Sequence, residues 1–378
     1  MKKIVYVIAS LGNAGGMERV LCTKANWLSQ NNYDVTIISV LPLEEDYFFE
    51  FHKNVKIESL AMHKQGKNII DFIFRTYNKE FEKRLKNRLF ELKPDITISM
   101  FGSEYAFLYK IKDGSKKVLE FHYSKNYLSH LMAHIPNLSF RRLRIWKFKY
   151  DQYNQRKIAL KYDKVILLTE KDQLLWNNKV NSWVIPNPVS FTTEQKSSLT
   201  NKQIVAIGRF TAQKGFDLLI KSYSIVAKKM PDWKLIIIGE GQDEAYFKKL
   251  IKTHNLENSV TLQPTTKNIK ELLLESSILA FPSRYEGFGL VLTEAMECGV
   301  PCVAFDCECG PSEIIQQDFD GHLVPLFDIE IFAKSLIKLM EDYNLRKKFG
   351  VNAKQNVKRF HNEEIMSKWV KLFESFND

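Results

Sequence analysis

Short runs of apolar residues alternate with amphipathic stretches along most of the chain, and few architectures accommodate such a pattern. Ile4–Ala9 and Asp34–Val40 are two of these runs, and the stretch between them, Met17–Gln30, carries apolar residues at helical spacing. A continuous β-branched run such as Asp34–Val40 is typical of a strand buried in a parallel sheet. Strands that alternate with helices therefore predict a doubly wound α/β fold.

The alternation breaks once, near the middle of the chain. Pro186-Asn187-Pro188 is a strong turn signal, and the residues that follow it, 190–202, are rich in Ser, Thr, Gln and Lys. The pattern of strands and helices restarts at Ile204–Ile207. Because 378 residues are enough for two ordinary domains, we expect one domain over 1–188 and a second over 189–361.

The composition excludes several classes of protein. Hydrophobic residues make up 45% and charged residues 26%, which is a globular balance and rules out disorder and collagen-like repeats. Five cysteines are too few for a disulfide scaffold and fit a reducing compartment. No apolar run approaches the length of a membrane span, and Ile4–Ala9 is too short for the apolar region of a signal peptide. We therefore expect a cytoplasmic protein.

The excess positive charge is confined to the first half. Residues 1–190 hold 31 Lys+Arg against 19 Asp+Glu, whereas 191–378 hold 24 against 25. Two segments, 75–93 and 139–164, concentrate this charge, and the second interleaves it with aromatic residues. Basic, aromatic-bearing helices suit an anionic membrane surface, and no nucleic-acid motif accompanies them. A solvated helix face whose aromatic residues pack inward is the alternative.

The most specific motif is the segment Ser283-Arg284-Tyr285-Glu286-Gly287-Phe288-Gly289-Leu290, which follows the apolar run Ile278–Phe281 and leads into a helical stretch. Its two glycines let the backbone approach a ligand, and the helix N-terminus offers free N–H groups to a diphosphate. Glu286 and Glu294 lie eight residues apart, so one carboxylate can reach the reacting end of a ligand and the other its deeper hydroxyls. Two surface glutamates on a strand–turn–helix are the alternative.

A second loop, Gly208–Gly215, follows the apolar run Ile204–Ile207. In it Arg209 offers a planar fork for phosphate and Lys214 a point charge. Ligands of doubly wound folds bind beyond the carboxyl ends of the strands, which is where this loop begins. An anion-binding role is therefore predicted for both cations, with solvated surface cations as the alternative.

Together the two loops resemble the donor site of the retaining GT-B glycosyltransferases of family 4, whose signature is the spacing Glu-x7-Glu. The amino half is similar as well: Asn13–Arg19 resembles the first strand–helix loop of that family, Glu120-Phe121-His122 the short strand that ends in its active-site histidine, and Val184–Pro188 its crossing between domains. The resemblance covers the whole chain. It implies two Rossmann-like domains facing a cleft, with a final helix, 362–378, packed back onto the first domain.

The resemblance also implies transfer of a hexose from a nucleoside-diphosphate sugar, most often UDP-linked, with retention of configuration. The residues expected to bind the donor are Gly15, Gly16, Arg209, Lys214, Glu286, Gly287, Phe288, Gly289, Leu290 and Glu294. Catalysis would depend on His122, Arg209, Lys214 and Glu286, because the departing nucleotide gains negative charge that fixed cations stabilise. The acceptor side would include Asn13, Glu18 and Asn187.

Neither a cofactor nor a metal is expected, since the nucleotide sugar is itself a substrate. Asp318-Phe319-Asp320 spells the Asp-x-Asp of metal-dependent glycosyltransferases, but it precedes Gly321 in a turn-like stretch. Four cysteines cluster over 298–309 without C-x2-C spacing, which favours small buried thiols over a metal site.

For the acceptor we expect a saccharide or a lipid-linked saccharide of cell-surface polysaccharide synthesis. The basic segments 75–93 and 139–164 would then bring the protein to the inner face of the membrane. Two alternatives stay open. One is a non-catalytic partner protein of the same fold, and the other is an enzyme of this fold that hydrolyses or epimerises a nucleotide sugar.

Overall fold

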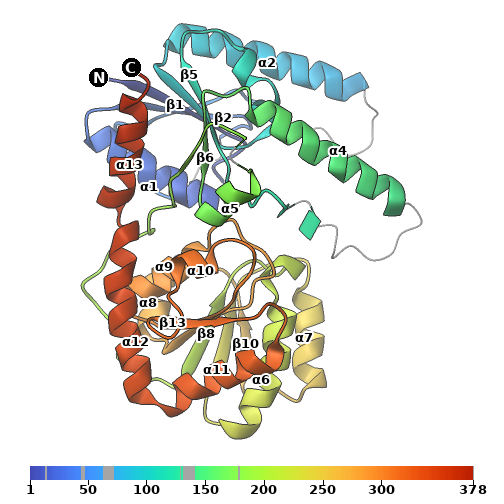
Figure 1. The fold of residues 1–378 in the computed structure, drawn as a ribbon, viewed down its shortest axis with the longest axis vertical. Coiled ribbons are helices and arrows are strands. Elements are labelled where there is room, and N and C mark those ends of the chain that lie inside the picture. The colour runs from blue at the N-terminus through green and yellow to red at the C-terminus, as the bar shows by residue number, and fades with distance from the viewer. Residues whose placement is uncertain are drawn as a thin grey trace. The chain divides into compact units, whose positions relative to one another are not determined.

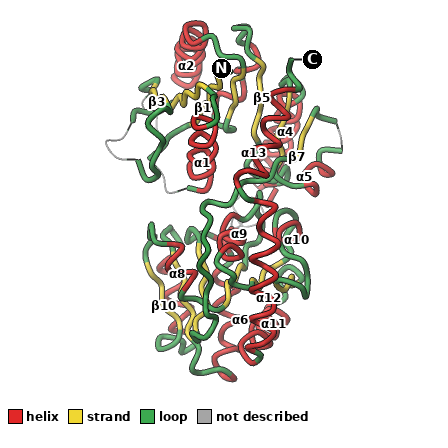
Figure 2. Tube along the Cα trace, turned by 90° about the vertical axis from the view of Figure 1, so that its left-hand side faces the viewer, coloured by secondary structure: helices red, strands yellow, loops and turns green. Residues whose placement is uncertain are grey.

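The computed structural model describes residues 1–12, 15–43, 47–62, 72–127, 129–130, 141–177 and 179–377. The chain divides into two compact units, which are treated one at a time. The first unit comprises Met1–His122, Phe140–Pro188 and Asn362–Asp378, and the second comprises Tyr123–Ser139 and Val189–His361. In each unit the strands of a sheet lie between helices (Figure 2).

The first unit is built on a seven-stranded parallel sheet with the order β3-β2-β1-β4-β5-β6-β7. Its interior strand β1 is buried at five of its six residues, as a strand covered on both faces should be. The strands are β1 Lys3–Ile8, β2 Asp34–Ser39, β3 Lys56–Ser59, β4 Ile96–Ser99, β5 Lys116–Glu120, β6 Lys164–Leu167 and β7 Ser182–Val184.

The helices of the first unit include one from the far end of the chain. They are α1 Gly16–Gln30, α2 Phe72–Leu92, α4 Arg141–Ala159, α5 Glu170–Leu175 and α13 Asn362–Glu374, with 3₁₀ turns η1 Ser103–Ala106 and η2 Leu108–Lys110. Helix α13 runs beside α1 (Figure 1). Its carbonyl at Phe373 accepts a hydrogen bond of 2.6 Å from Lys2 Nζ, and the Phe373 ring contacts Tyr33. None of the described helices is long and apolar enough to cross a bilayer.

The second unit is built on a six-stranded parallel sheet with the order β10-β9-β8-β11-β12-β13. Its strands are β8 Gln203–Ile207, β9 Lys234–Ile238, β10 Val260–Gln263, β11 Ile278–Phe281, β12 Cys302–Phe305 and β13 Gly321–Val324. Its helices are α6 Phe216–Lys229, α7 Glu244–Thr253, α8 Ile269–Leu274, α9 Leu290–Glu297, α10 Pro311–Ile314, α11 Ile329–Glu341 and α12 Tyr343–Asn356, with 3₁₀ turns η3 Ala212–Lys214 and η4 Val357–Phe360.

The predicted doubly wound α/β architecture is confirmed in both units. Two strands were not predicted. One is β3, and the other is β13, whose Asp320-Gly321 start suggested a turn although the strand pairs with β12 at the edge of its sheet. Within Tyr123–Ser139, which the sequence placed in the first domain, the described residues near 126–130 lie on the second unit. The reason is Glu308, which accepts from Asn126 Nδ2 at 2.8 Å and contacts His130 Nε2 at 3.0 Å.

Candidate functional site

Two loops of the second unit meet because their strands are neighbours. β8 and β11 pair in parallel, so the loops that leave their carboxyl ends start side by side. The N–H of Arg284 donates to the carbonyl of Gln213 at 2.8 Å. Gly215 has a φ of 67°, and a Cβ there would lie only 2.0 Å from the carbonyl oxygen of Pro282. Glycine is therefore required for the loops to approach this closely.

Arg284 joins the two loops with its side chain. Its guanidinium donates to both carboxylate oxygens of Asp217, at 2.8 and 2.7 Å, and to the carbonyl of Ala212 at 2.7 Å. Such bidentate pairing fixes the orientation of the guanidinium relative to the carboxylate as well as their distance. No role was predicted for this pair, because nothing in the local sequence around either residue indicates that residues 67 apart will meet.

The two loops also bring together Lys214 and Glu286, both predicted to bind the donor. Lys214 Nζ lies 2.6 Å from Glu286 Oε1, and it stands over the Phe281 ring at 5.5 Å from the centroid. The side chains are 17% and 8% exposed, so the charges compensate each other in a partly dehydrated site. Arg209 follows Gly208 at the same edge and is exposed. Two cations and a carboxylate thus stand at the carboxyl ends of β8 and β11.

Helix α9 begins at this edge. Gly289 precedes its first residue, Leu290, with a φ of 107°, a left-handed conformation that favours glycine. Within the described part of the chain, no side chain caps the helix. The N–H groups of its first turn are therefore placed to accept an anion, and the partial positive charge of the helix end favours one.

Glu294 lies in the second turn of α9 and is fully buried. Its Oε1 accepts a hydrogen bond of 2.6 Å from Ser190 Oγ. The carboxylate predicted to bind ribose hydroxyls thus accepts a hydrogen bond from a protein hydroxyl. Ser190, which provides it, lies just after the boundary between the units.

His122 directly follows β5 in the first unit, and its side chain is 6% exposed. Its Nε2 lies 3.4 Å from Glu120 Oε1. The pKa of His122 is lowered to about 4, mainly by burial; Glu120 opposes the shift, and the nearby Lys24 contributes to it. The imidazole is therefore neutral at pH 7 and can donate or accept hydrogen bonds without carrying charge.

Glu120, which lies next to His122, belongs to a buried ion pair. Lys24 of α1 places Nζ 2.5 Å from each carboxylate oxygen of Glu120 and 4.4 Å from the centroid of the Trp369 ring on α13. Lys24 was not predicted to be a site residue, although it lies at apolar helical spacing from Leu21 and Leu28. A charged residue on an apolar face is the signal that could have found it.

The remaining predicted residues of the first unit are spread over two places. Gly15 caps α1 and Gly16 is its first residue, and the Glu18 carboxylate lies so near that a Cβ on Gly15 would meet its Oε2 at 2.2 Å. Asn187 is buried near the end of the unit, with 5% of its surface exposed. Asn13 lies outside the described residues.

The Asp-x-Asp sequence has separate partners for its two carboxylates. Asp320 is buried, accepts from the N–H of Gln316 at 2.8 Å and pairs with Asn356, whereas Asp318 lies 3.0 Å from Nδ1 of His322. No three His, Cys, Asp or Glu residues of the described ranges gather as a metal site would require. All five cysteines are buried thiols, and the predicted burial of the four within 298–309 is confirmed.

Most of the second unit, including both loops, matches a known family model. Residues 191–356 match the family model described as Glycosyl transferases group 1. The chain is 30% identical over 375 residues to an uncharacterized glycosyltransferase of Haemophilus influenzae, which covers 98% of this chain and 99% of that protein. It is 28% identical over 383 residues to the amylovoran biosynthesis glycosyltransferase AmsD of Erwinia amylovora, covering 98% and 99%.

A solved structure is similar over the whole length. A variant of S. aureus TarM, crystallised with fondaparinux, α-GlcNAc-glycerol and UDP, matches with a TM-score of 0.80 at 19% identity and covers 99% of this chain and 100% of that one. At this identity the likeness shows the fold alone. The GT-B fold expected from the resemblance is thereby confirmed.

Proposed function

Because the chain belongs to the Glycosyl transferases group 1 family and is a glycosyltransferase, we propose that it moves a hexose from a UDP-linked sugar to an acceptor, with retention and without a metal. The observation that carries this proposal is the convergence of Lys214 and the uncapped N-terminus of α9 at the carboxyl ends of β8 and β11. The presence of UDP in the similar TarM structure favours uridine as the base.

The proposed chemistry follows from the charges at this edge. Cleavage of the sugar–phosphate bond increases the negative charge on the departing nucleoside diphosphate. Lys214, Arg209 and the N–H groups of Phe288, Gly289 and Leu290 would stabilise that charge, which is the task a metal performs in other transferases. Lys214 would leave Glu286 and pair with the phosphate. Glu286 would then accept hydrogen bonds from hydroxyls of the donor sugar, and Glu294 would bind the ribose.

His122 would take part as a neutral group. Its low pKa leaves it uncharged at pH 7, so it would hydrogen-bond the sugar rather than stabilise an anion. His122 belongs to the first unit and Lys214 to the second. The reaction would therefore require the two units to close around the substrates.

For the acceptor we propose a saccharide carried on a membrane lipid. In the described part of the segment 139–164, Tyr150 and Tyr153 are 54% and 55% exposed, so these two aromatic rings do not pack inward. Lys157 Nζ stands 4.5 Å from the Tyr153 ring centroid. Exposed tyrosines beside lysines suit the interface of an anionic membrane. The side chains of 75–78 and 139–149 lie outside the described residues.

Two arginines of the other basic segment are paired with carboxylates. On α2, Arg84 pairs with Glu80 at 2.8 Å, and Arg88 pairs with both Glu58 and Glu91 at 2.6 and 2.7 Å. Neutralised arginines contribute little to membrane attraction. Helix α4, with its two exposed tyrosines and Lys157 beside Tyr153, is the stronger candidate for the membrane-facing surface.

A turnover assay tests the function. The protein is incubated with UDP-sugars and an undecaprenyl-diphosphate-linked saccharide, and UDP release is followed with and without EDTA. Acceptor-dependent release that ignores EDTA supports the proposal. Release that needs no acceptor identifies a hydrolase, and conversion of the UDP-sugar into its epimer without release identifies an epimerase. Nucleotide binding with neither release nor epimer formation identifies a non-catalytic partner.

A further inference from the structure

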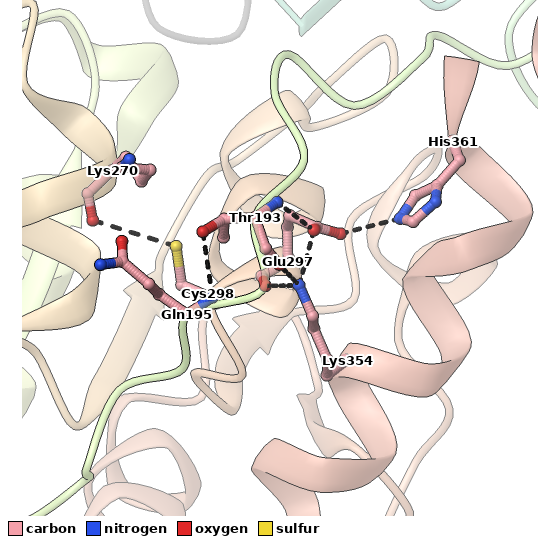
Figure 3. A network of polar contacts seen from close by, with 7 residues as sticks. All are labelled: Thr193, Gln195, Lys270, Glu297, Cys298, Lys354 and His361. Carbon is pink, nitrogen blue, oxygen red and sulfur yellow. Dashed lines mark hydrogen bonds and ion pairs between the residues drawn. The ribbon is translucent and has the colours of Figure 1, made fainter. Parts of the chain in front are cut away.

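Glu297, the last residue of α9, is 1% exposed and accepts from three segments of the second unit (Figure 3). Its Oε1 accepts from the N–H of Thr193 at 2.9 Å and from Lys354 Nζ at 2.6 Å. Its Oε2 lies 2.9 Å from Nε2 of His361. One buried carboxylate thus joins Thr193, at the start of the second unit, to Lys354 and His361 near its end.

Two of these points belong to the places where the chain passes between the units. The first crossing, residues 189–193, begins the second unit, and the second crossing, residues 357–361, ends it. The crossings contact each other directly, since the N–H of Val189 donates to the carbonyl of Phe360 at 2.8 Å. Lys354 reinforces this arrangement, because Nζ also donates to the carbonyl of Glu297 at 2.7 Å and to that of Thr193.

The loop 283–289 leads into the N-terminal end of α9 and is called the donor loop here. It contacts the same two crossings. Phe288 packs edge-on against Phe360, with ring centroids 5.4 Å apart. One turn before Glu297, Glu294 accepts from Ser190 of the first crossing at 2.6 Å. The donor loop and the two crossings are therefore parts of one packed cluster, joined by α9.

Such a cluster does not deform locally. Helix α9 has eight residues, six of them buried, and a close-packed element of this kind moves as a body. A shift at its N-terminus, where a diphosphate would bind, must be accommodated at Glu297. The carboxylate cannot release Lys354 freely, because the ammonium group would then be a mostly buried charge without a counterion.

We propose that Glu297 is a positioning residue that couples occupancy of the donor loop to the conformation of both crossings, and so to movement between the units. The proposal rests on the proposed donor site. It assigns a role to a carboxylate one turn beyond the Glu-x7-Glu pair. This carboxylate acts on the crossings through its contacts with His361, Lys354 and Thr193. By linkage, the coupling acts in both directions: a ligand at α9 shifts the crossings, and a change at the crossings shifts ligand affinity.

Hydrogen–deuterium exchange of the whole chain, with and without saturating UDP, tests this coupling. In the wild type, UDP should slow exchange at 286–290 and also, by about fivefold or more, at 189–193 and 357–361. In Glu297→Gln, UDP should still protect 286–290, whereas the protection of both crossings should be lost. The ratio of exchange with and without UDP is compared, since a merely structural role would raise both rates and leave the ratio unchanged.

Controls separate the outcomes. Glu271→Gln removes an exposed carboxylate on α8 and should behave as the wild type. His361→Gln, at a residue 26% exposed, removes one contact and should lose part of the coupling even if Glu297→Gln does not fold. Protection of 286–290 without protection of the crossings in the wild type overturns the inference alone, as does an unchanged ratio in Glu297→Gln. If UDP, ADP and GDP all leave 286–290 unprotected, the proposed donor site itself fails, and the inference with it.

Discussion

The ammonium group of Lys214 lies 2.6 Å from the carboxylate of Glu286, at the carboxyl ends of two neighbouring parallel strands. The two side chains come from different loops, and the Arg284–Asp217 pair holds those loops together. In the proposed mechanism this ion pair is the resting state of the donor site. A diphosphate takes the place of the carboxylate beside Lys214, and Glu286 is released to the sugar.

Arg284→Lys should destabilise the protein by about 1.5–3 kcal/mol, because a lysine keeps the charge and loses the two-pronged hydrogen bonds to Asp217. Urea unfolding followed by circular dichroism measures the change. Asp217→Asn and the double variant complete a cycle, and a coupling energy near zero would show that the pair does not hold the loops.

The pH dependence of stability should contain a contribution from His122. Its pKa falls from 6.5 to about 4 on folding, so the unfolded chain binds the proton more tightly. The stability gained from the neutral imidazole is complete above pH 6.5 and is lost as the pH falls toward 4, by up to about 3 kcal/mol. Urea titrations at pH 7.5, 5.5 and 4.5 should therefore show a shallower decline for His122→Gln than for the wild type. Parallel declines would contradict the burial of this residue.

Lys24→Met should destabilise the protein by about 3–5 kcal/mol, because it leaves the carboxylate of Glu120 buried without its cation. Adding Glu120→Gln to the variant should restore much of the loss, since no buried charge then remains. Thermal unfolding of both variants measures the effect. A double variant less stable than Lys24→Met would mean that Glu120 has another important partner.

Membrane binding should depend on α4. Replacing Lys157 of α4 and Lys161, which lies just after the helix, by alanine should weaken binding to vesicles with anionic lipid by about 30-fold, at about 1 kcal/mol for each lysine near the surface. Flotation with anionic and neutral vesicles at low and high salt measures this. Lys248→Ala, on α7 of the second unit, is the matched control. Equal flotation of all proteins, or no dependence on salt, would exclude an electrostatic membrane surface on α4.

Local patterns predicted most of the fold. Runs such as Ile4–Ala9 and Ile278–Phe281 form interior strands, and consecutive apolar residues are the local pattern that predicts burial on both faces of a sheet. β13 was missed because an Asp-Gly pair indicates a turn, while the ladder with β12 that makes it a strand is a long-range feature. The donor-loop residues were predicted from their spacing and the family resemblance.

Contacts between distant segments could not be predicted in the same way. Arg284 meets Asp217, and Glu297 meets His361, only because the order of the parallel strands brings their loops and helices together. Lys24 is a partial exception. Its place on the apolar face of α1 could have marked it as buried, but its partner Glu120 depends on the sheet.

The proposed donor site is tested most directly by calorimetric titration of UDP and UDP-sugars into the wild type, Lys214→Ala and the control Lys248→Ala, without metal. The account predicts that the wild type and the control bind alike, and that Lys214→Ala binds at least about tenfold more weakly, since a charge-assisted contact contributes about 1.5–3 kcal/mol. Equal binding by all three proteins would contradict the assignment of Lys214 to the donor diphosphate.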